Sequence, residues 1–563
     1  LSLALRGRLL SGTQTTFQGA LFGNSEPGFT FEPWDITTLY QDRAGTTPVT
    51  AAGQSVGLRL DKSKGLALGA ERGAALTLPG WTVTSGVTVS GGVAAFSSAA
   101  QNSNAYNVVG TVEVGKTYRV SLTVSSYVSG TAALLLPGGS GRGAITSNGT
   151  FTGIYTASST GVIYLWAQGA SNNTFVISDY SVRELAGNHE VAINDAARGI
   201  YGWMPKTGRR NQLTYSEQFD NAAWTKPFAG TGVVAIVTQN YGMAPDGTAT
   251  ACRLQLNKGA GATAGDYSGF QQTYSIASQS TGSIYIKTAN GTTKSVTLRT
   301  NTTTTSVSVT AEWQRVSVTE VSSSFLQIIL RGTYGTSDSA DLLIWHPQLE
   351  TGSTATAYQR VVSNYDITEA GVPSCYYVLA NGVNTAYSTP TITPNTDKVQ
   401  VFAGVRKLSD AAFQSIVELS ASADTNVGSF AVGASAATFD PTRTNWSTVL
   451  AGTTAGLVTS TLGVAAPNTS LLSLILDLAQ PTHALEAVLR RNGTTATVTQ
   501  SVAPAGGGNF NAYPAYIYAR GGTSMPFNGL DFGHVVRFGP NLDAATIARV
   551  ESLLARNTPE VTL

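Results

Sequence analysis

Charged residues are scarce in this 563-residue sequence, which has 34 Lys and Arg against 33 Asp and Glu and a net charge of +1. Together they make up 12% of the chain, about half the share that is usual in globular proteins. No basic run and no stripe of Lys and Arg among aromatic residues occurs, so nothing predicts a nucleic-acid partner. We expect a polar but nearly uncharged surface.

Cysteine and long apolar runs are also scarce. The sequence has only Cys252 and Cys375, which excludes a disulfide framework and a zinc site of the Cys-x-x-Cys kind. The longest apolar run, LLSLILDLA at 471–479, has the length of a core strand and is too short for a bilayer span. Arginine interrupts the opening LSLALRGRLL, so we expect no signal sequence and no membrane insertion. Because the sequence begins at Leu1 without Met, we expect that the real N-terminus was trimmed or left out.

Segments in which apolar and polar residues alternate are abundant. Examples are TYRVSLTVSSYV (117–128), GSIYIKTANG (282–291) and LQIILRGTYG (326–335), bounded by Gly, Asn, Ser and Thr. Strands of this kind at spacings of about 8–12 residues predict antiparallel β-sandwiches rather than parallel α/β units. One helical pattern, NLDAATIARVESLLARN (541–557), ends the chain with Asp543 as its N-cap. The sequence therefore predicts an all-β protein of tandem antiparallel β-sandwiches with a C-terminal helix.

Two stretches of the chain follow one plan, which is the signature of an internal repeat. Each has an early tryptophan, Trp81 or Trp224, and then a run of strands. Each ends on a strand followed by Glu and Gly, in VRELAG and in PQLETG. The predicted division is an N-terminal segment at 1–69, sandwiches at 70–187 and 211–362 joined by a linker at 188–210, and a third sandwich at 363–563.

No constellation of residues predicts catalysis. The four histidines, at 189, 346, 483 and 534, lie far apart in the sequence at no metal-ligand spacing. His346 and Glu350 would share a face of an extended strand but lie about 13 Å apart, too far to share a proton. No window gathers acidic and aromatic residues as a depolymerase cleft would, and no nucleophile-elbow sequence occurs. We predict no catalytic residue and no cofactor; a polysaccharide-degrading enzyme is the alternative.

Sugar binding by β-sandwiches depends on aromatic faces that stack on pyranose rings, with polar groups beside them. Tyr164 and Trp166 are two residues apart in one predicted strand and must share a face. The same argument places Tyr516 and Tyr518 together, next to a Tyr513-Pro514 loop. For each of these residues the alternative is an aromatic side chain in the core. The candidates are Tyr164 and Trp166, then Trp224 and Tyr241, then Trp446, Tyr513, Tyr516 and Tyr518, with Trp446 and the loop at 509–522 ranked first.

Several segments resemble modules of tailed-bacteriophage and prophage virion proteins. PWDITTLYQDRAGTTPVTAAGQSVGLRLDKS (33–63) resembles a leader that recurs ahead of lectin-like sandwiches. NQLTYSEQFDNAAWTK (211–226) and PQLETGSTATAYQRV (347–361) resemble the two ends of a carbohydrate-binding-module-like jelly roll. LLSLILDLAQPTHALEAVLRRNGT (471–494) and GLDFGHVVRFGPNLDAATIARVESLLA (529–555) resemble parts of a concanavalin A-like, laminin-G-like lectin sandwich.

The resemblance implies two jelly rolls and a concanavalin A-like sandwich behind a virion-attachment segment at 1–69. It implies a virion surface protein, a tail fibre, spike or tip component, which recognises the host by non-catalytic binding of cell-surface polysaccharide. A homotrimer joined to other virion proteins through 1–69 is the implied assembly. The rival interpretation is a structural capsid- or tail-decoration protein without glycan binding.

The resemblance also implies a structural calcium ion in the first jelly roll. Such modules commonly take a calcium ligand from an Asp of the final strand, and FVISDYSV (175–182) places Asp179 there. A solvated strand-end Asp is the alternative. ERGAALTLPGW (71–81) replaces the Asn-Gly-Asp-Phe-like turn that usually opens these modules, so no ligand contact is carried over from that turn.

Overall fold

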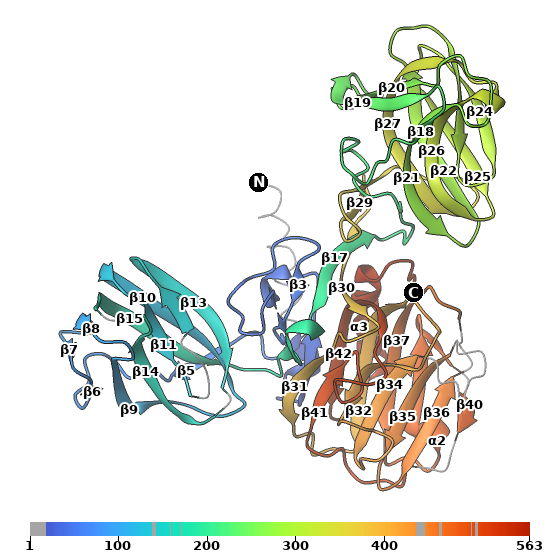
Figure 1. The fold of residues 1–563 in the computed structure, drawn as a ribbon. Helices are drawn as coiled ribbons and strands as arrows, with labels where there is room; N and C mark the ends of the chain where they lie inside the picture. Colours follow the sequence, from blue (N-terminus) through green and yellow to red (C-terminus); the bar gives the residue numbers. More distant parts are fainter. Residues whose placement is uncertain are drawn as a thin grey trace. The chain divides into compact units, whose positions relative to one another are not determined.

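The computed structural model describes residues 18–137, 142–157, 159–169, 172–434, 445–460, 464–496, 498–501 and 505–563. The chain is all-β, with antiparallel sheets packed as sandwiches, which confirms the predicted fold class (Figure 1). It divides into two compact units, one formed by 1–201 with 377–563 and the other by 202–376. Within the described ranges, no helix is both long enough and apolar enough to cross a bilayer.

The first sandwich is a jelly roll with the strand orders β13-β10-β15-β8-β7 and β12-β11-β14-β9-β6 (Figure 1). Its core lies between the two sheets and includes Phe96 and Phe175, whose stacked rings have centroids 4.6 Å apart. β5 extends the first sheet by pairing with β15. The strands are β5 (Leu68–Glu71), β6 (Thr82–Val83), β7 (Val87–Ser90), β8 (Val93–Ala99), β9 (Asn104–Val112), β10 (Thr117–Ser129), β11 (Ala132–Leu135), β12 (Arg142–Ile145), β13 (Gly149–Thr156), β14 (Gly161–Ala167) and β15 (Asn173–Leu185).

The second sandwich repeats this topology, with the orders β25-β22-β27-β20-β19 and β24-β23-β26-β21-β18. Strands β6 to β15 correspond in sequence to β18 to β27, so the repeat in the sequence is a repeat of the fold. The strands are β18 (Phe228–Ala229), β19 (Val233–Gly242), β20 (Ala251–Asn257), β21 (Tyr267–Ile276), β22 (Ser280–Thr288), β23 (Lys294–Arg299), β24 (Thr304–Val309), β25 (Gln314–Glu320), β26 (Ser323–Arg331) and β27 (Ser339–Thr351), with the 3₁₀ turn η3 (Gly332–Tyr334) and a small ribbon of β28 (Gln359–Val361) and β29 (Ile367–Glu369).

The third sandwich has one sheet of order β3-β17-β30-β42-β32-β37-β38-β39, in which β1 also pairs with β42, and a second of order β2-β4-β16-β31-β41-β33-β34-β35-β36-β40. Both sheets contain strands from 1–69 and from 188–210, which the sequence analysis separated from 363–563. The strands are β1 (Gly28–Phe31), β2 (Leu39–Tyr40), β3 (Ser55–Val56), β4 (Leu58–Arg59), β16 (Glu190–Ala192), β17 (Gly199–Pro205), β30 (Ser374–Asn381), β31 (Tyr387–Ile392), β32 (Lys398–Lys407), β33 (Gln414–Leu419), β34 (Ser429–Ala434), β35 (Trp446–Ala451), β36 (Ala455–Ser460), β37 (Asn468–Asp477), β38 (Ala487–Arg491), β39 (Thr494–Thr495), β40 (Val498–Ser501), β41 (Tyr513–Ile517) and β42 (Asn528–Phe538).

The C-terminal helix α3 (Ala544–Asn557) confirms the helical pattern read from the sequence. The Asp543 side chain accepts a hydrogen bond from Thr546 N at 2.6 Å, as expected of an N-cap. Val550 and Leu554 face the sandwich and are buried. The remaining helical turns are η1 (Ile36–Thr38), η2 (Asp195–Ala197) and α2 (His483–Glu486).

A buried ion network joins the N-terminal segment to the third sandwich. Arg59, from β4, is fully buried and forms ion pairs with Glu190 of β16 and with Asp531 of β42, the latter at 3.3 Å. Its guanidinium lies 4.0 Å from the ring centroids of Phe31 and Tyr387. The described part of 1–69 is therefore built into this sandwich, whereas its docking on other virion proteins stays a prediction; residues 1–17 lie outside the described residues.

His534 completes the same network and makes stability depend on pH. Its Nε2 lies 2.6 Å from Glu190 Oε1 and its Nδ1 2.8 Å from Asp531 Oδ2. Burial opposes protonation, but these carboxylates outweigh it and raise the pKa of His534 to about 9. An unfolded histidine titrates near pH 6.5, so this stabilisation is complete below about pH 6.5 and is lost as the pH rises through about 9.

We therefore expect the free energy of unfolding to fall by roughly 3 kcal/mol between pH 6.5 and pH 10 through this group. Denaturant unfolding of the full chain across that range measures it. A His534→Gln chain should show a flatter profile over the same range, because its side chain does not titrate. Equal slopes for the two chains would contradict the assignment.

Candidate functional site

One pair of corresponding sheets in the two jelly rolls carries surface features suited to a ligand. These are the sheets β12-β11-β14-β9-β6 and β24-β23-β26-β21-β18. In the first, β14 alternates between core and surface: Ile163, Leu165 and Ala167 are buried, while Tyr164 and Trp166 are partly exposed. The prediction that Tyr164 and Trp166 share a face is confirmed. Because β9 pairs with β14, Tyr106 lies directly opposite Tyr164, with ring centroids 4.9 Å apart.

The three rings form an aromatic platform, the name used below for Tyr106, Tyr164 and Trp166. Asn104 lies opposite Trp166 on β9, so an amide accompanies the rings. An aromatic surface with a neighbouring hydrogen-bonding group is the arrangement that stacks on a sugar ring and orients its hydroxyls. Sequence reasoning found two of the three rings and missed Tyr106, because only the pairing of β9 with β14 brings it there.

In the second jelly roll, the corresponding sheet holds a groove of about 250 Å³. Apart from Pro227, which precedes β18, its side chains come from β21, β23 and β26, while Leu326, Ile328 and Leu330 of β26 point into the core. Gly269 lies between Tyr267 and Gln271 on β21 and leaves space that a side chain would fill. The groove is lined by Pro227, Tyr267, Gln271, Arg299, Phe325, Gln327, Ile329 and Arg331.

The floor of this groove is polar and incompletely satisfied. Gln327 is only 5% exposed, and its Nε2 donates to Gln271 Oε1 at 2.5 Å. Its Oε1 is buried and has no hydrogen-bond partner among the described residues. A buried polar atom left without a partner is costly, so this oxygen marks a place where a ligand hydroxyl would gain a hydrogen bond. None of the groove residues was among the candidates from the sequence, although alternation along 325–331 would have assigned Phe325, Gln327, Ile329 and Arg331 to one face.

Two of the four aromatic candidates of the third sandwich, Trp446 and Tyr518, lie in its core, which corrects the ranking made from the sequence. Trp446 is only 1% exposed, with Lys407 Nζ 5.4 Å from its ring centroid, so its face is not free for a sugar. Tyr518 is fully buried and its hydroxyl donates to Asp531. Tyr516 remains partly exposed. The two tyrosines do not share a face, because β41 ends at Ile517 and Tyr518 takes a left-handed backbone conformation with φ of +67°.

The remaining sequence candidates take separate places. Tyr513 is partly exposed and donates to Val427 O at 3.2 Å. Trp224 belongs to the core of the second sandwich and stacks on Phe270 at 4.9 Å. Tyr241 on β19 is 51% exposed but is not part of the groove.

Asp179 lies on β15 and is exposed. Across the described ranges, no group of three or more His, Cys, Asp and Glu side chains could hold a metal ion. A calcium ion at Asp179 would therefore need ligands beyond such a cluster, for example backbone or amide carbonyl oxygens and water. The calcium site stays a prediction. If it exists, a chelator should lower the melting temperature of the unaltered chain and leave that of Asp179→Ala unchanged.

His346 and Glu350 have different partners. Glu350 is buried and accepts from Gln348 Nε2 at 2.6 Å. A φ of +51° at His346 turns its ring onto Trp345, and it lies 3.5 Å from Glu217. Burial lowers the pKa of His346, and the hydrogen bond from His346 lowers the pKa of Glu217. Glu217, Trp345 and His346 border a cavity of about 390 Å³ in the second unit, whereas Glu350 is not among its lining residues.

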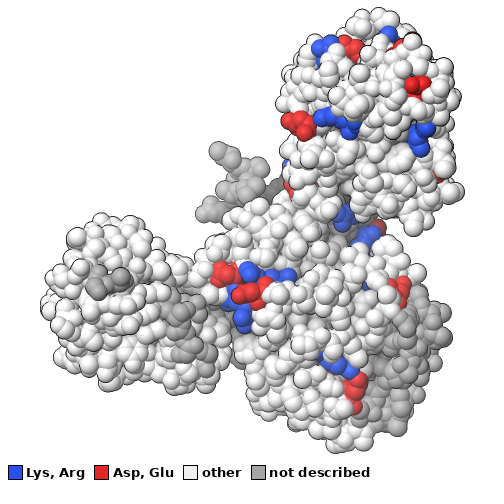
Figure 2. Space-filling view, viewed as in Figure 1, with Lys and Arg blue, Asp and Glu red and all other residues white. Residues whose placement is uncertain are grey.

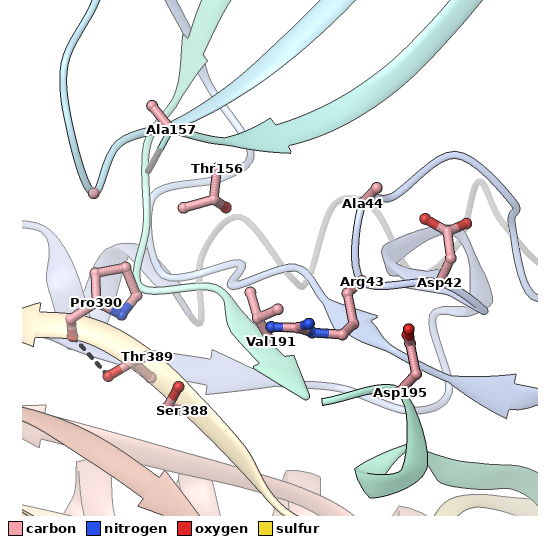
Figure 3. Close-up of a pocket in the computed structure, with 11 residues that line it drawn as sticks. Asp42, Arg43, Ala44, Thr156, Ala157, Val191, Asp195, Ser388, Thr389 and Pro390 are labelled. Atoms are coloured by element: carbon pink, nitrogen blue, oxygen red, sulfur yellow. Dashed lines mark hydrogen bonds between the residues drawn. The ribbon is translucent and has the colours of Figure 1, made fainter. Parts of the chain in front are cut away.

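A cavity of about 570 Å³ lies in the first unit (Figure 3). Arg43 points across it in Figure 3, and its Nε donates to Ala192 O at 2.7 Å. Its other lining side chains are small or short, among them Ala44, Thr156 and Ser388. No aromatic ring lines it, so it lacks the stacking surface of a sugar site.

The visible surface matches the low charge of the sequence. Figure 2 shows Lys, Arg, Asp and Glu in a few small mixed groups separated by uncharged surface. A surface of this kind exerts little long-range attraction on a charged partner. Binding would therefore depend on local contacts such as those of the aromatic platform and the groove.

No known family profile and no curated protein sequence matches the chain. Among solved structures, it is similar to the N-terminal CBM22-1-CBM22-2 tandem domain of Paenibacillus barcinonensis Xyn10C, with 11% identity, 54% of this chain and 99% of that chain covered, and a TM-score of 0.21. It is also similar to the M60 catalytic domain with CBM51-1 and CBM51-2 of Clostridium perfringens ZmpB (9% identity, 53% and 39% covered, TM-score 0.14). A Trypanosoma rangeli sialidase in complex with DANA matches at 9% identity, 83% of each chain covered and a TM-score of 0.22. These TM-scores are too low to transfer a function to this chain.

Proposed function

We propose that the chain is a non-catalytic glycan-binding protein whose two jelly rolls bind sugar on equivalent sheets. The observation that carries the proposal is the position of the two features described above. The aromatic platform lies on β9 and β14, and the groove lies on β21, β23 and β26, of which β21 and β26 are the counterparts of β9 and β14. Because the two features lie on corresponding strands of the two repeats, we infer that they serve the same purpose in both.

The chemistry of both faces supports binding rather than hydrolysis. Glycosidases use two facing carboxyl groups, and no Asp or Glu is among the groove-lining residues. The strands of the aromatic platform present rings and an amide. Release of oligosaccharides from a bound polysaccharide during incubation with the chain would overturn the non-enzymatic assignment.

We place this binding on the surface of a tailed-phage or prophage virion, as the resemblance of the sequence implies. There the protein would act as a tail fibre, spike or tip component that recognises host polysaccharide. Several weak sites on one particle gain avidity when they engage the same polymer. Immunogold labelling of intact particles tests the location, and light scattering of the purified chain tests the expected homotrimer.

Removal of the platform rings should weaken binding to host polysaccharide. We expect Trp166→Ala and Tyr164→Ala each to raise Kd about tenfold, which corresponds to about 1.4 kcal/mol lost per stacking ring. Surface plasmon resonance on immobilised polysaccharide measures the change. Tyr241→Ala, which removes an exposed ring away from both faces, is the matched control and should leave Kd unchanged.

If no polysaccharide of a susceptible host binds the unaltered chain while particles still need it for assembly, the decorative structural role is the correct one. Equal losses in Tyr241→Ala and Trp166→Ala would also count against the platform, since they would indicate a general effect of removing surface rings.

A further inference from the structure

We propose that the groove of the second jelly roll selects an acidic sugar and holds its carboxylate between Arg299 and Arg331. This inference rests on the proposed function and names the ligand class of one of its two faces. It follows from the charges in the groove, from the hydrogen bonds that orient them and from the groove's size.

The two guanidinium groups are held close together by one tyrosine. Arg299 Nη1 donates to Tyr334 Oη at 3.3 Å, and Arg331 Nη1 donates to the same oxygen at 3.2 Å. Arg299 also donates to Asn301 O at 2.6 Å, and Arg331 donates to Ala264 O at 2.7 Å. These bonds fix both side chains, so the groove is organised before any ligand arrives.

Among the described residues, neither Arg299 nor Arg331 forms an ion pair, and no Asp or Glu is among the residues that line the groove. Two like charges that share one hydrogen-bond acceptor repel each other. An anion placed beside them would remove that repulsion, which gives an anionic ligand an advantage over a neutral one of the same shape.

The donors that remain suit an oxyanion. Each guanidinium has five N–H donors in a planar fork that matches a carboxylate, and the bonds above use two in each residue. Arg299 lies over the Phe325 ring at 4.9 Å and Arg331 over the Tyr267 ring at 5.7 Å. Each cation therefore covers one face of an aromatic ring, which holds the guanidinium in place at the edge of the groove.

The groove also has the size and polar floor for one sugar unit. Its volume of about 250 Å³ is below the range of about 300–1,000 Å³ typical of pockets for drug-sized ligands. Gln327 Oε1, buried and without a partner among the described residues, accepts a hydroxyl at its floor. The described residues of the aromatic platform and the neighbouring Asn104 include no guanidinium, so the two faces should differ in their preference for charge.

Glucuronate and glucose are the matched probes, because they differ only in the carboxylate at carbon 6. We expect saturation-transfer NMR with the full chain to give a Kd at least about tenfold lower for glucuronate, the effect of one charge-assisted hydrogen-bonded pair. N-acetylneuraminate distinguishes a sialic acid source of the carboxylate from a uronic acid source. Equal affinity for glucose, or preferential binding of glucose 6-sulfate alone, would overturn the carboxylate assignment.

Substitutions of the two groove arginines test whether they cause the preference for glucuronate. Arg299→Gln and Arg331→Gln should each abolish the preference for glucuronate, and Arg331→Lys should keep part of it, because it retains charge but loses the planar fork. Lys287→Gln, on β22 of the other sheet, removes the same charge and should change nothing. If both arginine variants keep the preference for glucuronate and have unchanged melting temperatures, the inference is wrong.

Failure of this inference differs from failure of the proposed function. If neutral polysaccharide still binds through the aromatic platform while the groove shows no preference for acid, only the inference is wrong. If no glycan of either kind binds, the proposed function is wrong as well.

Discussion

Arg59→Ala should lower the free energy of unfolding of the first unit by about 3–5 kcal/mol, the largest effect of any single substitution considered. Its removal leaves the carboxylates of Glu190 and Asp531 buried with one less cation, and such an uncompensated buried charge is strongly destabilising. It also removes the guanidinium from between two aromatic rings. Urea unfolding of the full chain near pH 7 measures the loss.

Two comparisons test whether loss of the buried ion network causes the destabilisation in Arg59→Ala. Arg549→Ala removes an exposed arginine of α3 and should change stability by no more than about 0.5 kcal/mol. Glu190→Gln should cost less in the Arg59→Ala background than in the unaltered chain, because the pair is coupled. Additive losses would show that Arg59 acts through packing alone.

The fragment 363–563, which the sequence delimits as a domain, should not fold by itself. It lacks β1, whose residues 28–31 pair with 534–537 of β42. It also lacks Leu21 and Phe22, which pack in the cluster beneath α3, and both Arg59 and Glu190. Together these losses are comparable to the whole stability of an ordinary domain, about 5–15 kcal/mol. We expect no cooperative unfolding transition and no near-ultraviolet circular dichroism signal.

The matched control is a chain in which a short Gly-Ser linker replaces 202–376. This deletion removes the second compact unit, 202–376, and keeps the whole of the first, 1–201 with 377–563. It should unfold cooperatively. A folded 363–563 fragment, with a transition as sharp as that of the control, would show that the N-terminal strands are dispensable.

Local periodicity predicted the parts of the structure that depend on neighbours in sequence. Alternation correctly placed Tyr164 and Trp166 on one face, and the 3.6-residue pattern correctly gave α3. The same rule failed at Tyr518, because one left-handed residue at the end of β41 reverses the direction of its side chain. Alternation assigns a face only while the backbone remains extended.

Features assembled from distant strands could not be predicted in this way. The strands of the N-terminal segment are short, β2, β3 and β4 having two residues each, and carry almost no periodic signal. The groove draws Arg299 and Arg331 from different strands that pair side by side, β23 and β26. Periodicity assigns each arginine to a face, whereas the pairing of the strands decides that the two meet.

The pairing of β1 with β42 has a consequence for synthesis on the ribosome. Gly28 is matched with Arg537, so about 500 residues separate the two partners. At translation rates of about 5–20 residues per second, β1 waits roughly 25 to 100 s for its place in the sheet. Both jelly rolls are complete within that interval and can fold first. The sandwich that contains the first strand is thus the last to close, and its exposed edges need protection from aggregation until then.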